Sequence, residues 1–179
     1  MRVEILAGCV AMITSGPAAA AEEQTHSNTS GTADMKSPVG EWLVNDQTAR
    51  IRIENCGGEM WGAVSWEKSP GGQDTHNPDP AKRSRATLGL PVILNMQQSQ
   101  DGRWDGEVYN AQNGKTYTAH MRMLNPGTLR IEGCVLGFLC GSENWTRFEP
   151  KTSAQKSTLV VGRELDVCSG VSDRKGRPR

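Results

Sequence analysis

Large apolar and aromatic side chains are scarce in this sequence of 179 residues. Aromatic residues make up 5% of the chain, with only two phenylalanines and two tyrosines. The longest apolar stretch covers nine residues, from Ile5 to Ile13. A membrane-spanning helix needs about 20 consecutive apolar residues. We therefore expect no transmembrane segment.

Motifs of metal and hydrolase chemistry are also missing. The chain has no Cys-x-x-Cys or His-x-x-x-His pair, which zinc sites use, and no Gly-x-Ser-x-Gly or phosphate-binding loop. His76 and His120 are the only histidines in the part that we expect to fold. Catalysis needs a nucleophile, a base and an orienting group together, and the sequence does not point to such a set. It therefore predicts no catalytic residue, no metal site and no cofactor, and makes a hydrolytic enzyme the least favoured function.

The first 20 residues have the layout of a secretory signal peptide. A charged start, Met1-Arg2-Val3-Glu4, leads into the apolar stretch, and small residues ending in Ala18-Ala19-Ala20 follow. We predict that residues 1–20 are cleaved off and that the mature protein is periplasmic or secreted. Leu6-Ala7-Gly8-Cys9 offers an alternative, because it is similar to the site where bacterial lipoproteins receive a lipid on cysteine.

Both flanks of the middle region are polar. Residues 21–37 contain no large apolar side chain except Met35, and residues 150–179 are rich in lysine and arginine. Such segments cannot bury enough surface to offset the entropy of ordering them. We expect a disordered linker over 21–37, a folded domain over 38–149 and a basic disordered tail over 150–179. The tail lacks the aromatic side chains on which bases stack, so no nucleic-acid partner is predicted.

The middle region alternates in polarity like β-strands and shows no sustained helical period. Ile51 and Ile53 alternate with Arg50 and Arg52, so one face meets a core and the other meets solvent. Such runs recur at intervals of roughly ten residues, which is typical of β-sandwiches and β-barrels. The predicted strands are Glu41–Asn45, Ala49–Asn55, Glu59–Glu67, Val92–Gln97, Arg103–Asn110, Lys115–Leu124, Thr128–Cys134 and Ser142–Phe148.

Tight turns connect these runs. Cys56-Gly57-Gly58, Gln112-Asn113-Gly114 and Asn125-Pro126-Gly127 supply the backbone conformations that short hairpins need. Consecutive hairpins make a meander, and an eight-stranded meander removes its exposed edges by closing on itself. The sequence therefore predicts an all-β fold, an eight-stranded antiparallel up-and-down barrel. Its interior is either filled by side chains or holds one small ligand.

A polar, proline-rich segment, Lys68–Gly89, interrupts the strand pattern. Asp79 followed by Pro80 predicts one short helical turn, because aspartate caps helices and proline suits their first position. The candidate ligand-binding residues of the chain gather in this long loop: Asp74, Asn77, Asp79, Arg83 and Arg85. Together they can bind an anion through the arginines or a cation through the oxygens. Alternatively, they hold the loop in shape by hydrogen-bonding one another.

Four cysteines remain after removal of the signal peptide, and an even number suggests disulfides in an exported protein. Cys134 and Cys140 are the natural pair, because they flank a short apolar run and can close a tight loop between two strands. Cys56 and Cys168 either pair with each other or remain free.

Several short motifs occur in order along the middle region. They include Val39-Gly40-Glu41-Trp42, Cys56-Gly57-Gly58, Asn77-Pro78-Asp79-Pro80, Gly114-Lys115-Thr116-Tyr117 and Trp145-Thr146-Arg147. Through these motifs the chain resembles, from Val39 to Phe148, the bacterial exported family called domain of unknown function 2147. The resemblance implies a lipocalin-like β-barrel of the cell envelope without an established activity. It also implies a structural role for Gly40, Trp42 and Arg147, which look like the Gly-x-Trp and arginine that close one end of a lipocalin barrel.

Two functions of different classes fit such a barrel. The first is a non-enzymatic periplasmic protein that holds a small apolar or amphipathic molecule inside, with the loop from Asp74 to Arg85 at the mouth. The second is a structural or protein-interaction module with a packed interior, whose partner is another envelope protein. The aromatic side chains do not decide between the two functions, because they can line a cavity or fill a core.

Overall fold

The computed structural model describes residues 37–135, 139–149 and 165–169. The predicted signal peptide, its cleavage site, the alternative lipid site at Cys9 and nearly all of the predicted linker lie outside these residues. Most of the predicted basic tail lies outside them as well. These expectations therefore stay predictions.

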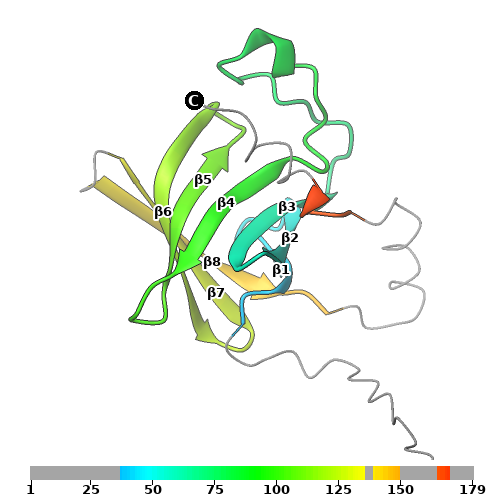
Figure 1. Ribbon diagram of the computed structural model, residues 1–179. Helices are drawn as coiled ribbons and strands as arrows, with labels where there is room; N and C mark the ends of the chain where they lie inside the picture. Colours follow the sequence, from blue (N-terminus) through cyan, green and yellow to red (C-terminus); the bar gives the residue numbers. More distant parts are fainter. Residues whose placement is uncertain (1–36, 136–138, 150–164, 170–179) are drawn as a thin grey trace, which may run out of the picture. The chain divides into compact units, whose positions relative to one another are not determined.

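Eight antiparallel strands form one closed barrel, in the order in which they follow one another along the chain. Figure 1 shows the strands curving round to form the barrel. The last strand returns to pair with the first, where Trp42 lies opposite Arg147. The predicted all-β, eight-stranded up-and-down barrel is therefore confirmed. The strands are β1 (Gly40–Leu43), β2 (Ala49–Cys56), β3 (Glu59–Glu67), β4 (Pro91–Gln98), β5 (Trp104–Asn110), β6 (Lys115–Asn125), β7 (Thr128–Val135) and β8 (Leu139–Arg147).

The largest difference from the predicted strand boundaries is at β8. This strand begins at Leu139, whereas polarity alternation predicts a start at Ser142. Cys134 lies opposite Cys140 and Val135 lies opposite Leu139, so the β7–β8 ladder continues past the cysteines. Alternation cannot reveal this extension, because Leu139 is apolar and yet exposed.

The core is formed by the apolar side chains that alternate with polar ones along the strands. Ile51 and Ile53 on β2 are at most 3% exposed, while Arg52 between them is partly exposed. The interior therefore takes every second side chain of the strand. The same core cluster contains Trp42, Trp104 and Trp145 together with Met60, Met96 and Met121.

The long loop between β3 and β4 carries a single 3₁₀ turn, η1 (Pro80–Lys82). The Asp79 carboxylate accepts a hydrogen bond from the backbone N of Ala81 at 3.0 Å, so the predicted capped turn is confirmed. Figure 1 shows the loop, drawn in green, extending away from the strands at one end of the barrel. No helix in the described residues is long and apolar enough to span a membrane.

A short segment near the end of the chain packs against β3. Val167 is 5% exposed and forms a second apolar cluster with Trp61 and Ala63. The neighbouring Cys168 is joined to Cys56 at the end of β2. The described residues 165–169 thus differ from the predicted disordered tail, because a covalent link and an apolar contact hold them to the barrel.

Candidate functional site

The candidate binding residues of the β3–β4 loop meet around a buried carboxylate. Asp74 is 0% exposed. Its Oδ2 accepts hydrogen bonds from Asn77 Nδ2 at 2.7 Å and from Arg85 Nε at 2.8 Å, and Arg85 Nη2 lies 2.7 Å away. Its Oδ1 accepts a hydrogen bond from the hydroxyl of Tyr109 on β5 at 2.6 Å. Both oxygens of the Asp74 carboxylate therefore have partners.

The other candidates extend this network toward solvent. Asn77 Oδ1 accepts a hydrogen bond from the backbone N of Asp79 at 2.9 Å. Arg83 Nε donates to the backbone O of Asn77 at 2.8 Å. Asp79 also forms an ion pair with Lys82, with Oδ2 and Nζ 3.0 Å apart. The structure thus brings together, in one connected set of contacts, Asp74, Asn77, Asp79, Arg83 and Arg85.

Electrostatic contacts keep the Asp74 carboxylate charged. Burial on its own raises the pKa of Asp74, but the hydrogen bonds from Tyr109, Asn77 and Arg85 and the charge of Arg85 outweigh burial, and the pKa lies below the ordinary value of 3.8. Burial raises the pKa of Tyr109, and its hydrogen bond to Asp74 raises it further. With these shifts the neutral Tyr109 hydroxyl can donate its proton to the charged Asp74 carboxylate.

These contacts favour the structural interpretation of the loop cluster. A ligand cannot reach the Asp74 carboxylate without displacing Arg85 or Tyr109, and Asn77 is only 5% exposed. Leaving a buried polar group unpaired costs about 1–3 kcal/mol. Arg83 is the one exposed member of the five candidate residues.

Sequence analysis does not identify Tyr109 and Gly114, which also hold the loop. Tyr109 looks like one more core aromatic, since its partner Asp74 lies 35 positions earlier. Gly114 has a φ of +68°, and a Cβ at this position would overlap the backbone O of His76. The Asn-Gly pair predicts the turn between β5 and β6, but the approach of the long loop to that turn is a tertiary feature without a local signal.

The residues predicted to close the barrel contact one another where β1 meets β8. Arg147 lies over the Trp42 ring, with Cζ 4.3 Å from the ring centroid. Gly40 has a φ of +138°, and a Cβ there would lie 2.7 Å from Arg147 Nη1. The guanidinium also donates to three backbone oxygens, those of Ser37 at 2.9 Å, Val39 at 2.9 Å and Pro126 at 2.7 Å. These contacts join the first and last strands of the barrel.

Both pairs of described cysteines form disulfides. Cys134 and Cys140 are joined across β7 and β8, where they lie directly opposite each other. Cys56 and Cys168, whose pairing the sequence leaves open, are joined across a separation of 112 residues.

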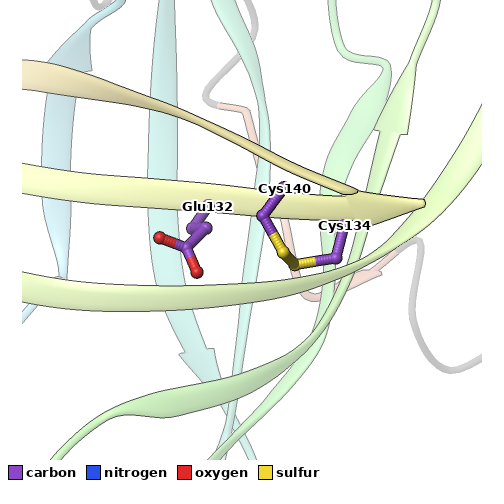
Figure 2. A group of neighbouring side chains, drawn as sticks. All are labelled: Glu132, Cys134 and Cys140. Carbon is purple, nitrogen blue, oxygen red and sulfur yellow. A yellow bond between two sulfur atoms is a disulfide. The ribbon is translucent and has the colours of Figure 1, made fainter. Parts of the chain in front are cut away.

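Carboxylates lie close to both disulfides. Figure 2 shows the Glu132 side chain beside the bond between Cys134 and Cys140. Glu54 and Asp166 lie near Cys168 in the same way. Such groups can hold a metal only when the cysteines are thiolates, and here their sulfurs are bonded to each other. Neither group therefore fits a metal ion in this oxidised form.

The two histidines of the folded part belong to different regions. His76 is exposed in the β3–β4 loop, whereas His120 on β6 has its Nδ1 2.7 Å from Asp105 Oδ1. Neither histidine is among the hydrogen-bond partners of Asp74 within the described residues.

One donor inside the barrel has no acceptor. Trp145 on β8 is 4% exposed and belongs to the core cluster. Its Nε1 is buried and has no hydrogen-bond partner among the residues that the structure describes. The Nε1 of Trp42, by contrast, donates to the backbone O of Pro38 at 2.7 Å. A buried indole N–H usually finds an acceptor, so the unpaired Nε1 of Trp145 is an unusual feature of the core.

Comparisons with known proteins bear on family and fold. A family model described as an uncharacterized protein conserved in bacteria (DUF2147) matches residues 40–147. Among solved structures, protein HP1028 from the human pathogen Helicobacter pylori, described as belonging to the lipocalin family, is similar with a TM-score of 0.59 and 17% identity. The match covers 69% of this chain and 89% of that one, and at this identity it shows the fold alone. No curated protein matches the chain.

Proposed function

Since the chain belongs to the DUF2147 family of uncharacterized bacterial proteins, we propose a function from the barrel itself, namely non-enzymatic binding of a small apolar or amphipathic molecule in the periplasm. The lipocalin-like fold supports binding inside the barrel, because an eight-stranded barrel is wide enough to hold one small ligand. The signal-peptide layout of residues 1–20 supports export.

The observation that carries the proposal is the unpaired N–H of Trp145. Leaving a buried donor without an acceptor costs about 1–3 kcal/mol, so a ligand that brings an acceptor to this atom gains a hydrogen bond and removes the penalty. Trp145 belongs to the hydrophobic core cluster, so the matching ligand has an apolar body and one polar acceptor such as a carbonyl or carboxylate oxygen.

The methionines of the core offer a way to make room. Met60, Met96 and Met121 belong to the same core cluster as Trp145 and are at most 7% exposed. Methionine side chains are unbranched and adapt to irregular neighbours, which is why they are common on surfaces that bind varied apolar partners. Their rearrangement can open space inside the barrel without moving the strands.

A packed structural or protein-interaction module is the second candidate. Trp42, Ile53, Ile93 and Leu129 are all 0% exposed, which is what an interior filled by its own side chains requires. In this case the outside of the barrel meets another envelope protein.

Titration with a dansyl-labelled fatty acid distinguishes the two. Trp145→Phe keeps an aromatic ring in the core but removes the N–H donor and part of the indole ring. Trp66→Phe makes the same change at a ring that stacks with Arg50 at 4.6 Å, and it is therefore the matched control. Interior binding predicts that Trp145→Phe weakens probe binding about two- to tenfold, as the loss of one hydrogen bond would, while Trp66→Phe leaves it unchanged.

A packed interior predicts a different result. The probe then shows no saturable binding to the wild-type protein, and Trp145→Phe lowers stability, because the smaller ring leaves part of a packed core empty. That pair of results would remove the support for interior binding.

A further inference from the structure

A groove of about 150 Å³ runs along the outer wall of the barrel, over β6 and β7. Arginine side chains dominate its lining, with Arg103, Arg122 and Arg130 joined by His120 and Glu132. Leu124 and the core residue Met121 complete the lining. The polar side chains belong to the outward face of their strands, so the groove opens on the outside of the barrel.

The strand register explains why these charges gather. Arg122 on β6 lies directly opposite Arg130 on β7, and His120 lies directly opposite Glu132. Residues opposite each other on one face have Cβ atoms only about 4.5–5.5 Å apart, and like charges in such positions destabilise a sheet. The two arginine side chains therefore start from neighbouring positions on the outer face, where their like charges repel unless an anion offsets them.

The three arginines differ in how far protein groups neutralise them. Arg103 pairs with Asp105 at 2.7 Å, and the same carboxylate holds His120 at 2.7 Å. Arg130 donates to Ser142 Oγ at 2.7 Å and has Glu132 at 3.7 Å. Arg122 forms no hydrogen bond and no ion pair with the residues that the structure describes, and it is exposed. Its donors are therefore available to a ligand.

We propose that this groove binds a phosphate group, held between the guanidinium groups of Arg122 and Arg130. Arginine suits this role because its planar fork of donors matches phosphate oxygens in pairs. A bound phosphate also offsets the repulsion between the two guanidinium groups. Among the described residues, Asp101 attracts Arg122 electrostatically but forms no ion pair with it. Glu132 stands at the wall of the groove and opposes the anion, so it limits the affinity.

The test is a titration of the purified full protein with inorganic phosphate at low ionic strength, followed by calorimetry. Arg122→Gln and Arg130→Gln should each weaken binding about tenfold or more, as the loss of a charged hydrogen bond would. Glu132→Gln should strengthen it. Lys82→Gln is the control, because it removes the same charge from the distant loop helix η1 and should leave the affinity unchanged.

Vesicle binding identifies the source of the phosphate group. Sedimentation with vesicles containing an anionic phospholipid, but not with purely zwitterionic vesicles, and its loss in Arg122→Gln would assign the groove to a lipid headgroup. Phosphate binding without vesicle binding would assign it to a soluble phosphate compound. The proposal is overturned if neither probe binds, or if Lys82→Gln weakens binding as much as Arg122→Gln does. A melting curve of each variant confirms that the barrel remains folded.

Discussion

At the scale of single residues, Gly40 shows how one missing side chain allows the barrel to close. Its φ of +138° is a conformation that other residues rarely adopt, and a Cβ would lie 2.7 Å from Arg147 Nη1. The glycine therefore allows the arginine to lie over Trp42 and to reach the backbone near the start of β1.

We predict that Gly40→Ala lowers the free energy of unfolding by about 1–3 kcal/mol, because the backbone is strained and the guanidinium is displaced. Gly141→Ala is the matched control, since nothing lies within 4 Å of the Cβ that it would add. Urea unfolding measures both. Equal stability of the two variants would contradict this account of barrel closure.

Asp74 is the second residue on which a large part of the structure depends, and its charge makes the dependence sensitive to pH. The folded-state pKa lies below the unfolded value of about 3.8, so the folded protein binds fewer protons than the unfolded chain at acidic pH. Its stabilising contribution is therefore complete above pH 4 or so and is lost as the pH falls through the folded-state pKa.

We predict that Asp74→Asn destabilises the protein by about 1.5–3 kcal/mol at pH 7, because Arg85 and Tyr109 lose a charged acceptor. The difference from the wild-type protein should shrink as the pH falls below about 4, because Asp74 is protonated first in the unfolded chain and then, below its lowered pKa, in the folded protein. Urea unfolding at neutral and acidic pH checks this. A difference that stays constant across that range would show that the charge of Asp74 does not matter.

At the scale of elements, the β3–β4 loop keeps its shape through side-chain contacts to neighbouring segments. Tyr109 from β5 and the glycine of the β5–β6 turn hold it from one side, and Arg85 holds it from within. A loop of this length and polarity has no apolar core of its own, so the hydrogen-bond network supplies its order.

We predict that Arg85→Ala increases hydrogen exchange of the loop amides and lowers the free energy of unfolding by about 1–3 kcal/mol, since Asp74 is left buried with fewer partners. Lys82→Ala removes an exposed partner of Asp79 and should change stability by less than about 0.5 kcal/mol. Hydrogen exchange read by mass spectrometry compares them. Equal protection of the loop in both variants would refute the role given to Arg85.

The two disulfides should stabilise the fold to different extents. Cys56 and Cys168 are 112 residues apart and Cys134 and Cys140 only 6, and loop-closure entropy grows with the length of the closed loop. The estimate is about 4.7 kcal/mol for a loop of roughly 100 residues and less than about 3 kcal/mol for the short one.

We predict that replacing both Cys56 and Cys168 by serine lowers the melting temperature more than replacing both Cys134 and Cys140. Release of the C-terminal segment from the barrel reduces the first effect, because residues 165–169 then regain freedom in the folded state as well. Calorimetry of the two double variants gives the order. The reverse order would mean that the hairpin of β7 and β8 depends on its cross-link more than the chain-entropy estimate allows.

The strands were predictable because the information that specifies them is local. Ile51 and Ile53 alternate with arginines, and glycine turns separate the runs, so number, order and direction of the strands follow from the sequence. The attachment of residues 165–169 to β3 was not predictable, since two apolar contacts, from Leu165 and Val167, in a polar tail give no periodic pattern. The same holds for Tyr109, whose partner lies in a distant loop.

The sequence predicted which loop residues come together, but it did not predict whether they bind a ligand or stabilise the loop. Asp74, Asn77 and Arg85 are residue types that suit both a binding site and a structural network, and only burial separates the two. Asp74 is 0% exposed and both of its carboxylate oxygens are hydrogen-bonded. Burial and hydrogen bonding depend on the three-dimensional structure and cannot be read from the sequence. The unpaired donor of Trp145 is equally invisible in sequence, because it depends on what surrounds the indole.

At the scale of the whole molecule, the central claim is that the barrel holds a small amphipathic molecule beside Trp145. Native mass spectrometry of protein isolated from the periplasm without denaturation tests it most directly. We predict a mature chain that begins at Ala21 or Glu22, carrying a small noncovalent adduct that denaturation releases and that Trp145→Phe carries at lower occupancy. A wild-type protein with the same bare mass before and after denaturation would contradict the claim.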